Sequence, residues 1–298
     1  LNSNLDAAQD TFQEDLNGTF TVLDTITKKA CTVVSKIEVV NSNIDIVQDC
    51  FGIPIRDADL PLTISMSGKY YVAEQLSVIA TQTAITIATD DVIIEFLGRT
   101  LDGTSKASEI GILVNPGISG VNIMNGTIRE TGESAIQISP ACENIMISNM
   151  SIIDTSTHGI EVSGCTTLLI DDCRITNCEN DGLHIGQSSD VVVQESLFNN
   201  NGDGGSTGHG VYTQDCTRVS VFDCIANNNE DSGFTFTTDA DGTIDQHQIL
   251  ECKAFQNNQN GVFIINAEDS VIQGCICRDN TEVGIRLHGC LNVEVSEN

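Results

Sequence analysis

The chain has 298 residues, of which 40% are hydrophobic, 18% are charged and 4% are aromatic. Its 42 acidic and 13 basic residues give a formal net charge of −29 at pH 7, which excludes charge-driven binding to nucleic acid or to an anionic membrane. No stretch approaches the roughly 20 apolar residues that a membrane span needs. We therefore expect no nucleic-acid partner and no membrane span.

The first fifty residues carry a heptad pattern. Between residues 21 and 48, apolar side chains recur at alternating steps of three and four, as in the seam of a coiled coil. The seam consists of Leu23, Ile26, Ala30, Val33, Ile37, Val40, Ile44 and Val47. Its β-branched residues favour a trimer, and weak helix propensity means that partner helices must stabilise it. We predict an α-helical coiled-coil stalk over residues 1–50; one amphipathic helix packed along its own domain, or a strand-rich segment, are the alternatives.

Residues 51–61 interrupt this pattern and hold two of the four prolines, which predicts a neck or linker. From residue 62 onward, a small residue followed by alternating apolar residues recurs every 23 to 28 residues. The small residues are Ala84, Gly111, Ala135, Gly159, Gly182, Gly210, Gly233, Gly261 and Gly284. A second short strand and an Asn-rich turn follow each one, and units this small must stack to bury an apolar core. The last unit is incomplete at residue 298, so we expect a fragmentary or processed product.

These repeats resemble the right-handed parallel β-helix proteins of the pectin-lyase-like superfamily. The likeness covers residues 62–298, and residues 67–76 and 90–103 resemble the opening coils of such domains. The resemblance implies an all-β fold, a right-handed single-stranded parallel β-helix that follows the stalk. It says little of function, because the superfamily includes lyases, hydrolases, epimerases, phage tailspikes and structural proteins.

Twelve cysteines are present, and most of them keep the phase of the repeat. One column holds Cys173, Cys224, Cys252 and Cys275, and another holds Cys142, Cys165, Cys216 and Cys290. Stacked columns of a small, readily buried residue predict ladders inside a solenoid. Disulfides and a metal site are the alternatives.

Polygalacturonase-like members of the superfamily carry Asn-Thr-Asp, Asp-Asp, Gly-His-Gly and Arg-Ile-Lys on successive coils. Here Asp181 precedes Gly182, and His209 lies between two glycines on the next coil, both at the corresponding phase of the repeat. Asp181 and His209 are therefore the catalytic candidates. The pattern departs at His158, where an Asp is expected, and at Asn180, and the coil after His209 has no basic residue. Ordinary turn sequences are the alternative explanation, because Asp and His before Gly are common in turns.

One outward column of the first strand reads Gln137, Glu161, His184, Tyr212, Thr235, Phe263 and Arg286. Its Glu161, His184, Tyr212, Phe263 and Arg286 are candidates for glycan binding, although any exposed strand face carries a similar mixture.

Two coils contain longer loops, where solenoids tend to place function. Asp239, Asp241 and Asp245 in one of them resemble part of a calcium loop. Calcium needs six to eight oxygen ligands and no Glu completes the pattern, so a solvated turn is the alternative. We expect no cofactor other than calcium.

Three functions follow from this architecture. The first is a non-enzymatic surface fibre, a homotrimer that presents the β-helix for attachment to glycans or other surface structures. The second is a polysaccharide lyase or glycoside hydrolase, and the third is a structural component of a larger filament or capsid. We expect an extracellular location, on a cell surface or on a virus or other particle.

Overall fold

The computed structural model describes residues 52–298 except for residues 79–80, 105, 107–108, 203–207 and 239–245. The predicted stalk, with every residue of its seam, and the loop aspartates Asp239, Asp241 and Asp245 lie outside the described residues. Within the described part, no helix has the length and apolar composition that a bilayer span requires.

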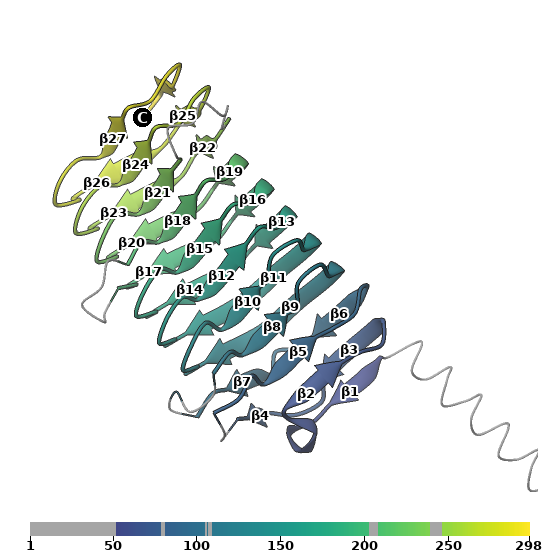
Figure 1. The fold of residues 1–298 in the computed structure, drawn as a ribbon. Coiled ribbons are helices and arrows are strands. Elements are labelled where there is room, and N and C mark those ends of the chain that lie inside the picture. The colour runs from purple at the N-terminus through teal and green to yellow at the C-terminus, as the bar shows by residue number, and fades with distance from the viewer. Residues whose placement is uncertain (1–51, 79–80, 105, 107–108, 203–207, 239–245) are drawn as a thin grey trace, which may run out of the picture. The chain divides into compact units, whose positions relative to one another are not determined.

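The body is a stack of coils whose strands form two parallel sheets (Figure 1). A ten-stranded sheet contains the first strand of each coil, and an eighteen-stranded sheet contains the others. The ten-stranded sheet comprises β2 (Leu62–Ile64), β5 (Ile85–Ile87), β8 (Ile112–Val114), β10 (Ile136–Ile138), β12 (Ile160–Ser163), β15 (Leu183–Gly186), β18 (Val211–Gln214), β21 (Phe234–Thr237), β24 (Val262–Ile265) and β27 (Ile285–His288).

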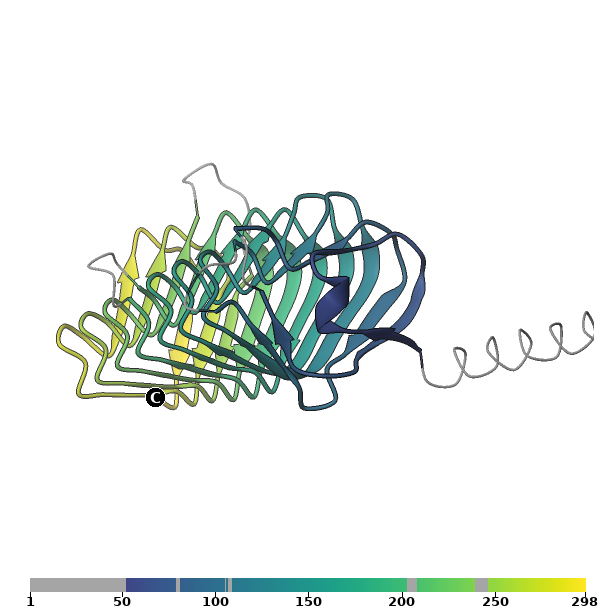
Figure 2. The same cartoon turned by 90° about the horizontal axis from the view of Figure 1, so that it is seen from below.

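The larger sheet has two rows of strands. The rows are joined by two long strands, β9 (Ser119–Arg129) and β11 (Glu143–Ile153), each of which pairs with strands of both rows. One row comprises β1 (Ile53–Ile55), β3 (Gly68–Val72), β6 (Val92–Glu95), β9, β11, β13 (Thr166–Asp171), β16 (Ser189–Gln194), β19 (Thr217–Phe222), β22 (Gln248–Leu250), β25 (Val271–Gln273) and β28 (Glu294–Ser296). The other adds β4 (Leu76–Ser77), β7 (Thr100–Asp102), β14 (Arg174–Thr176), β17 (Leu197–Asn199), β20 (Ile225–Asn227), β23 (Lys253–Phe255) and β26 (Ile276–Arg278) to the long strands β9 and β11. This arrangement confirms the predicted parallel β-helix, and Figure 2 shows its coils edge-on.

The body starts earlier than the sequence indicated. Ile53 of β1 pairs with Tyr70 of β3, and Ile55 is fully buried. A 3-10 turn, η1 (Asp57–Asp59), then leads into the first strand of the ten-stranded sheet. Most of the segment that was predicted to be a neck therefore belongs to the first coil, because alternating apolar residues such as Ile53 and Ile55 suit a strand despite the neighbouring prolines.

The small residue before each first strand is required by close packing between coils. A Cβ atom on Gly210 would lie 2.5 Å from the carbonyl oxygen of Gly233 in the next coil and 2.8 Å from the Cβ of Ala226. Two coils accommodate the methyl group of an alanine at this position, Ala84 and Ala135, but at Gly210 even a methyl group would require neighbouring atoms to shift. The residue just before this position is consequently held at the sheet edge, where its side chain faces the neighbouring coils.

A ladder of buried asparagines stabilises one corner of the later coils. Asn201, Asn229, Asn257 and Asn280 stack, and the Nδ2 atom of each of the first three donates to the Oδ1 atom of the next at 2.9 Å. Nδ2 of Asn229 also donates to the carbonyl of Phe198 at 3.1 Å. One asparagine of each of these Asn-rich turns is thus an interior, hydrogen-bonded residue of the corner.

The ten cysteines that the structure describes are all free thiols, which confirms the predicted ladders and excludes disulfides among them. In one column, the Sγ atoms of Cys224, Cys252 and Cys275 donate to backbone carbonyls of the preceding coil at 3.4–3.6 Å. Burial raises the pKa of Cys173 and of Cys178 to about 12.

We expect these two thiols to resist alkylation in the native protein. At about pH 8 a thiol with a pKa near 12 is almost entirely protonated, and the thiolate is the reactive form. Peptide mapping after treatment with iodoacetamide should find Cys173 and Cys178 unmodified until a denaturant is added, whereas the partly buried Cys290 serves as the internal comparison. Equal labelling of Cys173 in native and unfolded protein would contradict the ladder.

His247 makes the fold sensitive to acid. Its side chain is fully buried against the Phe236 ring, and neither ring nitrogen has a hydrogen-bond partner among the described residues. Burial lowers the pKa of His247 to about 4. In the unfolded chain His247 is protonated near pH 6.5, whereas in the folded chain it is protonated only near pH 4. The free energy of unfolding therefore falls as the pH drops from about 6.5 to about 4.

Replacing His247 with Phe should remove about 3 kcal/mol of this acid destabilisation, the equivalent of 2.5 pKa units. The measurement is urea unfolding of both proteins at about pH 7 and about pH 4. The loss of stability between the two pH values should be smaller in the variant. An identical loss in both proteins would show that His247 is not buried as a neutral imidazole.

Candidate functional site

The outer face of the ten-stranded sheet carries the predicted column of side chains. The strand register places Gln137, Glu161, His184, Tyr212, Thr235, Phe263 and Arg286 opposite one another on successive strands. A second row runs beside it, made by the residues that precede the small residue of each coil. The site forms where the two rows meet, on the coils of β12, β15 and β18.

Three consecutive members of the second row, His158, Asp181 and His209, each accept a hydrogen bond from the backbone of the next coil. Nδ1 of His158 accepts from the amide of Asp181 at 3.3 Å, and Oδ1 of Asp181 accepts from the amide of His209 at 2.8 Å. Nδ1 of His209 in turn accepts from the amide of Ser232 at 3.3 Å. This ladder fixes the direction in which each side chain points.

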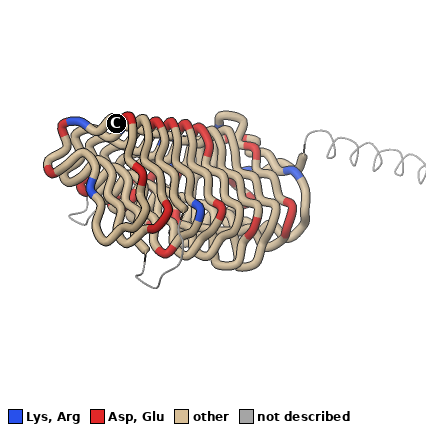
Figure 3. The backbone as a smooth tube through the Cα atoms, turned by 90° about the horizontal axis from the view of Figure 1, so that it is seen from above, with Lys and Arg blue, Asp and Glu red and all other residues tan. Residues whose placement is uncertain are grey.

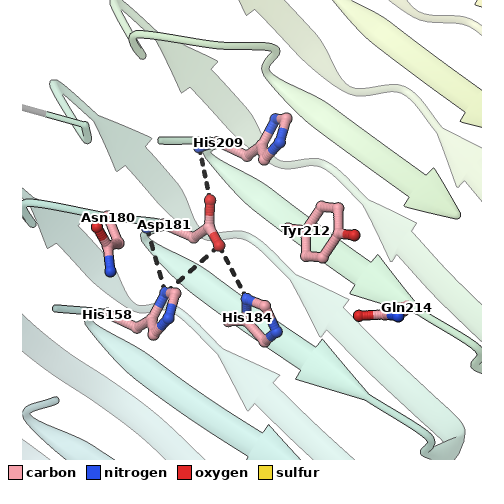
Figure 4. A pocket seen from close by; sticks show the side chains of 7 residues that line it. All are labelled: His158, Asn180, Asp181, His184, His209, Tyr212 and Gln214. Atoms are coloured by element: carbon pink, nitrogen blue, oxygen red, sulfur yellow. Dashed lines mark hydrogen bonds and ion pairs between the residues drawn. The ribbon is translucent and has the colours of Figure 1, made fainter. Parts of the chain in front are cut away.

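Asp181 lies at the centre of the site, with its side chain only 7% exposed (Figure 4). Its Oδ2 atom is 2.9 Å from Nδ1 of His184 on the same coil and 3.4 Å from Nδ1 of His158 on the preceding coil. Its Oδ1 atom is already occupied by the His209 amide. The carboxylate therefore joins three consecutive coils.

The pKa of Asp181 is set by opposing effects. Burial raises it, but hydrogen bonds to His158 and His184 and the proximity of His209 lower it further than burial raises it, so that the pKa lies well below its usual range. Asp181 is a carboxylate at any physiological pH. Because its pKa is depressed, its contribution to stability is present above the ordinary Asp pKa and is lost as the pH falls below it.

His209 is held mainly in its neutral form. Burial lowers its pKa, and the nearby carboxylates of Asp181 and Asp231 oppose this only in part. Its Nδ1 atom lies 3.1 Å from Oγ1 of Thr235, and its ring stacks on Tyr212 with the centroids 5.1 Å apart and the planes inclined by 14°. The neutral ring thus forms one wall of the site.

These residues surround a shallow depression of about 400 Å³. It is lined by His158, Asn180, Asp181, His184, His209, Tyr212 and Gln214. The rings of His184 and Tyr212 lie 5.0 Å apart, and those of His158 and His184 lie 4.5 Å apart. An open depression with aromatic faces and polar tips is suited to a sugar, whose two faces are apolar and whose edge carries hydroxyls.

The structure brings together four of the residues that the sequence singled out, namely Asp181, His184, His209 and Tyr212. Glu161 lies on β12, in the same coil as His158, but does not line the depression; its Oε2 atom accepts from Oγ of Ser134 at 3.0 Å. Phe263 and Arg286 lie on later coils outside the depression, with the guanidinium 4.9 Å above the Phe263 ring.

In the sequence, His158 stands out only as a departure from a hydrolase pattern. In the structure it is a direct neighbour of Asp181 and lines the depression. The signal that could have identified it is its position before Gly159, one repeat before Asp181 and two before His209. Polar, titratable side chains at this same phase of three consecutive coils must meet at one edge of the sheet.

The family of the chain follows from a comparison with known protein families. A family described as a right-handed β-helix region matches residues 64–207 and 205–298, which is most of the chain. The chain belongs to this right-handed β-helix family. The match confirms the resemblance and the right-handedness that the resemblance implied.

Among solved structures, this β-helix protein is similar to the A-module of a mannuronan C-5 epimerase from Azotobacter vinelandii, with 13% identity, a TM-score of 0.52, and coverage of 81% of this chain and 86% of the other. It is also similar to the ORF18 protein of Geobacillus virus E2, with 15% identity and a TM-score of 0.48, over 86% of this chain and 55% of the other. A tailspike protein 2 domain of bacteriophage CBA120 matches with 10% identity and a TM-score of 0.44, over 79% and 42%. A search of curated proteins found no match. At 13% identity, the likeness to the epimerase module establishes the fold alone.

The cluster can perform two kinds of chemistry. An imidazole held by a carboxylate through one nitrogen can accept or donate a proton through the other, as in many acid–base sites. In addition, His158, Asp181 and His184 each offer one ligand atom that lies within 4.8 Å of the other two, which is close enough to share one metal ion.

Proposed function

We propose that this β-helix protein binds a polysaccharide across the outer face of the ten-stranded sheet and transfers protons to or from it at the cluster of His158, Asp181 and His184. The observation that carries the proposal is the buried carboxylate of Asp181, which contacts two imidazoles on the floor of an open depression. Burying a carboxylate costs free energy of desolvation on folding, and such groups are concentrated at functional sites. The fold of the similar epimerase module supports a glycan as the substrate class.

The charge of the protein narrows the choice of glycan. Acidic residues are spread over the coils and basic residues are few, as Figure 3 shows for the described part of the chain. With a formal net charge of −29, the surface repels polyuronates unless a divalent cation screens the contact. Neutral glycans, or acidic glycans with a divalent cation, are therefore the expected substrates.

The test is a panel of neutral and acidic polysaccharides, each incubated with the protein with and without a divalent cation. New reducing ends, unsaturated sugars and inverted stereocentres should be followed by NMR. We expect one glycan class to be altered by the wild type and by His288→Ala, but not by His184→Ala, because His184 contacts Asp181 in the depression, whereas His288 lies on β27, three strands beyond β18, and does not line the depression. Unchanged activity in His184→Ala, or none on any glycan, would contradict the proposal.

The heptad pattern of residues 21–48 supports a second proposal, which is compatible with the first. In it the chain is a homotrimeric fibre at a cell or particle surface, or a component of a larger filament, and it presents the β-helix for attachment. Light scattering of the full chain should give a mass near three chains, and near one chain without residues 1–50. A single-chain mass for both proteins would refute the trimer.

A further inference from the structure

The cluster around Asp181 has the composition and spacing of a metal site. Nδ1 of His158 lies 3.4 Å from Oδ2 of Asp181, and Nδ1 of His184 lies 2.9 Å from the same oxygen. Ligand atoms on a tetrahedron around zinc, at bond lengths near 2.1 Å, are separated by about 3.4 Å. One ligand atom from each of the three residues lies within 4.8 Å of the others, so rotation of the imidazoles would bring the three atoms to the spacing of one ion.

The hydrogen bonds of the cluster do not supply a positively charged partner for every contact of the Asp181 carboxylate. Nδ1 of His158 lies 3.3 Å from the amide nitrogen of Asp181 and 3.4 Å from its Oδ2 atom, so it can accept the amide proton or donate to the carboxylate, but it cannot do both. When it accepts the amide proton, its contact with the carboxylate oxygen at 3.4 Å places two electron-rich atoms against each other. Among the described residues no Lys or Arg pairs with Asp181. A proton on Nδ1 of His184 makes the contact between His184 and Asp181 favourable, but not the contact between His158 and Asp181. A cation between the three atoms would make both contacts favourable.

The surroundings orient the ligands as they do in metal sites. The amide of His209 holds the other oxygen of Asp181 at 2.8 Å, which leaves Oδ2 directed at the imidazoles. The side chain of His184 is 27% exposed, and the cluster opens to the depression on that side. Three protein ligands with one open position is the arrangement of catalytic zinc sites.

We propose that Nδ1 of His158, Oδ2 of Asp181 and Nδ1 of His184 bind one Zn²⁺ or a similar divalent transition metal, with the fourth position open to the depression. Two imidazoles with one carboxylate select such a metal over calcium, which takes six to eight oxygen ligands. The metal site stands on the geometry of its three ligands. Only its consequence for catalysis, a bound water acidic enough to exchange protons with a glycan, rests on the proposed function.

The test uses the full chain, stripped of metal with a chelator, and Co²⁺ as a spectroscopic probe that Zn²⁺ then displaces. One Co²⁺ per chain should bind with visible d–d absorption and without a thiolate-to-cobalt charge-transfer band, which separates this site from the cysteines. His184→Ala and Asp181→Asn should weaken binding by at least about 100-fold, since changes to outer-shell partners alone cost 10- to 100-fold. His288→Ala should bind like the wild type.

Circular dichroism and the thermal midpoint check that each variant is folded, and His158→Gln gives a third ligand change at a less exposed position. Binding that is equal in wild type and all three ligand variants, a thiolate spectrum, or no stoichiometric binding would overturn the metal site. Loss of the metal site with intact glycan turnover refutes this inference alone. Metal binding without turnover of any glycan upholds it and refutes the proposed function.

Discussion

Asp181→Asn is expected to lower the rate of glycan turnover by about 10² to 10⁴, the range that positioned acid–base groups contribute. Asn has the same shape and can still accept the His209 amide proton through Oδ1. Its other atom, however, is a neutral NH₂ group that would face Nδ1 of both His158 and His184 without charge. The two imidazoles lose the carboxylate that sets their orientation and proton affinity. The measurement is the turnover rate on the glycan class identified by the panel.

Asp190→Asn provides the matched control, because Asp190 is 44% exposed at its side chain and pairs with Arg218 away from the depression. It should turn over glycan at the rate of the wild type. If both variants lose activity equally, the loss reflects charge or folding; if neither does, Asp181 has no part in the reaction.

Asn229→Ala is expected to destabilise the body by about 3 to 6 kcal/mol, because several buried polar groups lose their partners at about 1 to 3 kcal/mol each. The amide and Nδ2 of Asn201 both donate to Oδ1 of Asn229, and Nδ2 of Asn229 donates to Oδ1 of Asn257 and to the carbonyl of Phe198. Alanine replaces none of these bonds. The free energy of unfolding in urea gives the cost.

Asn258→Ala is the control for this change, since Asn258 is an exposed neighbour in the same type of turn. Its stability should stay within about 0.5 kcal/mol of the wild type, as for most surface substitutions. An Asn229→Ala variant as stable as Asn258→Ala would show that the ladder is not closed to water.

The fold could be predicted because every coil has the same packing requirement. A small residue is needed where Gly210 meets Gly233, and alternating apolar residues must follow it, so the same signal returns in every coil. The start of the body could not be predicted from repeats. β1 has no preceding coil with which to share a pattern, and its Ile53 and Ile55 flank a proline.

The candidate site was only partly predictable. The outward column that contains His184 and Tyr212 follows from strand alternation alone. The contact of His158 with Asp181 depends instead on side chains that turn along the sheet edge toward the next coil. The motif of polygalacturonase-like enzymes does not identify His158, because that motif has an aspartate at this position.

The five histidines of the chain allow a direct test of where the ligand acts. The imidazole signals of the ¹⁵N-labelled protein can be followed by NMR while the oligosaccharide of the active glycan class is added. We predict shifts for His158, His184 and His209, which line the depression, and none for the buried His247 or the exposed His288. Shifts confined to His288, or no shift at any histidine under saturating oligosaccharide, would contradict the assignment of the functional site to this depression.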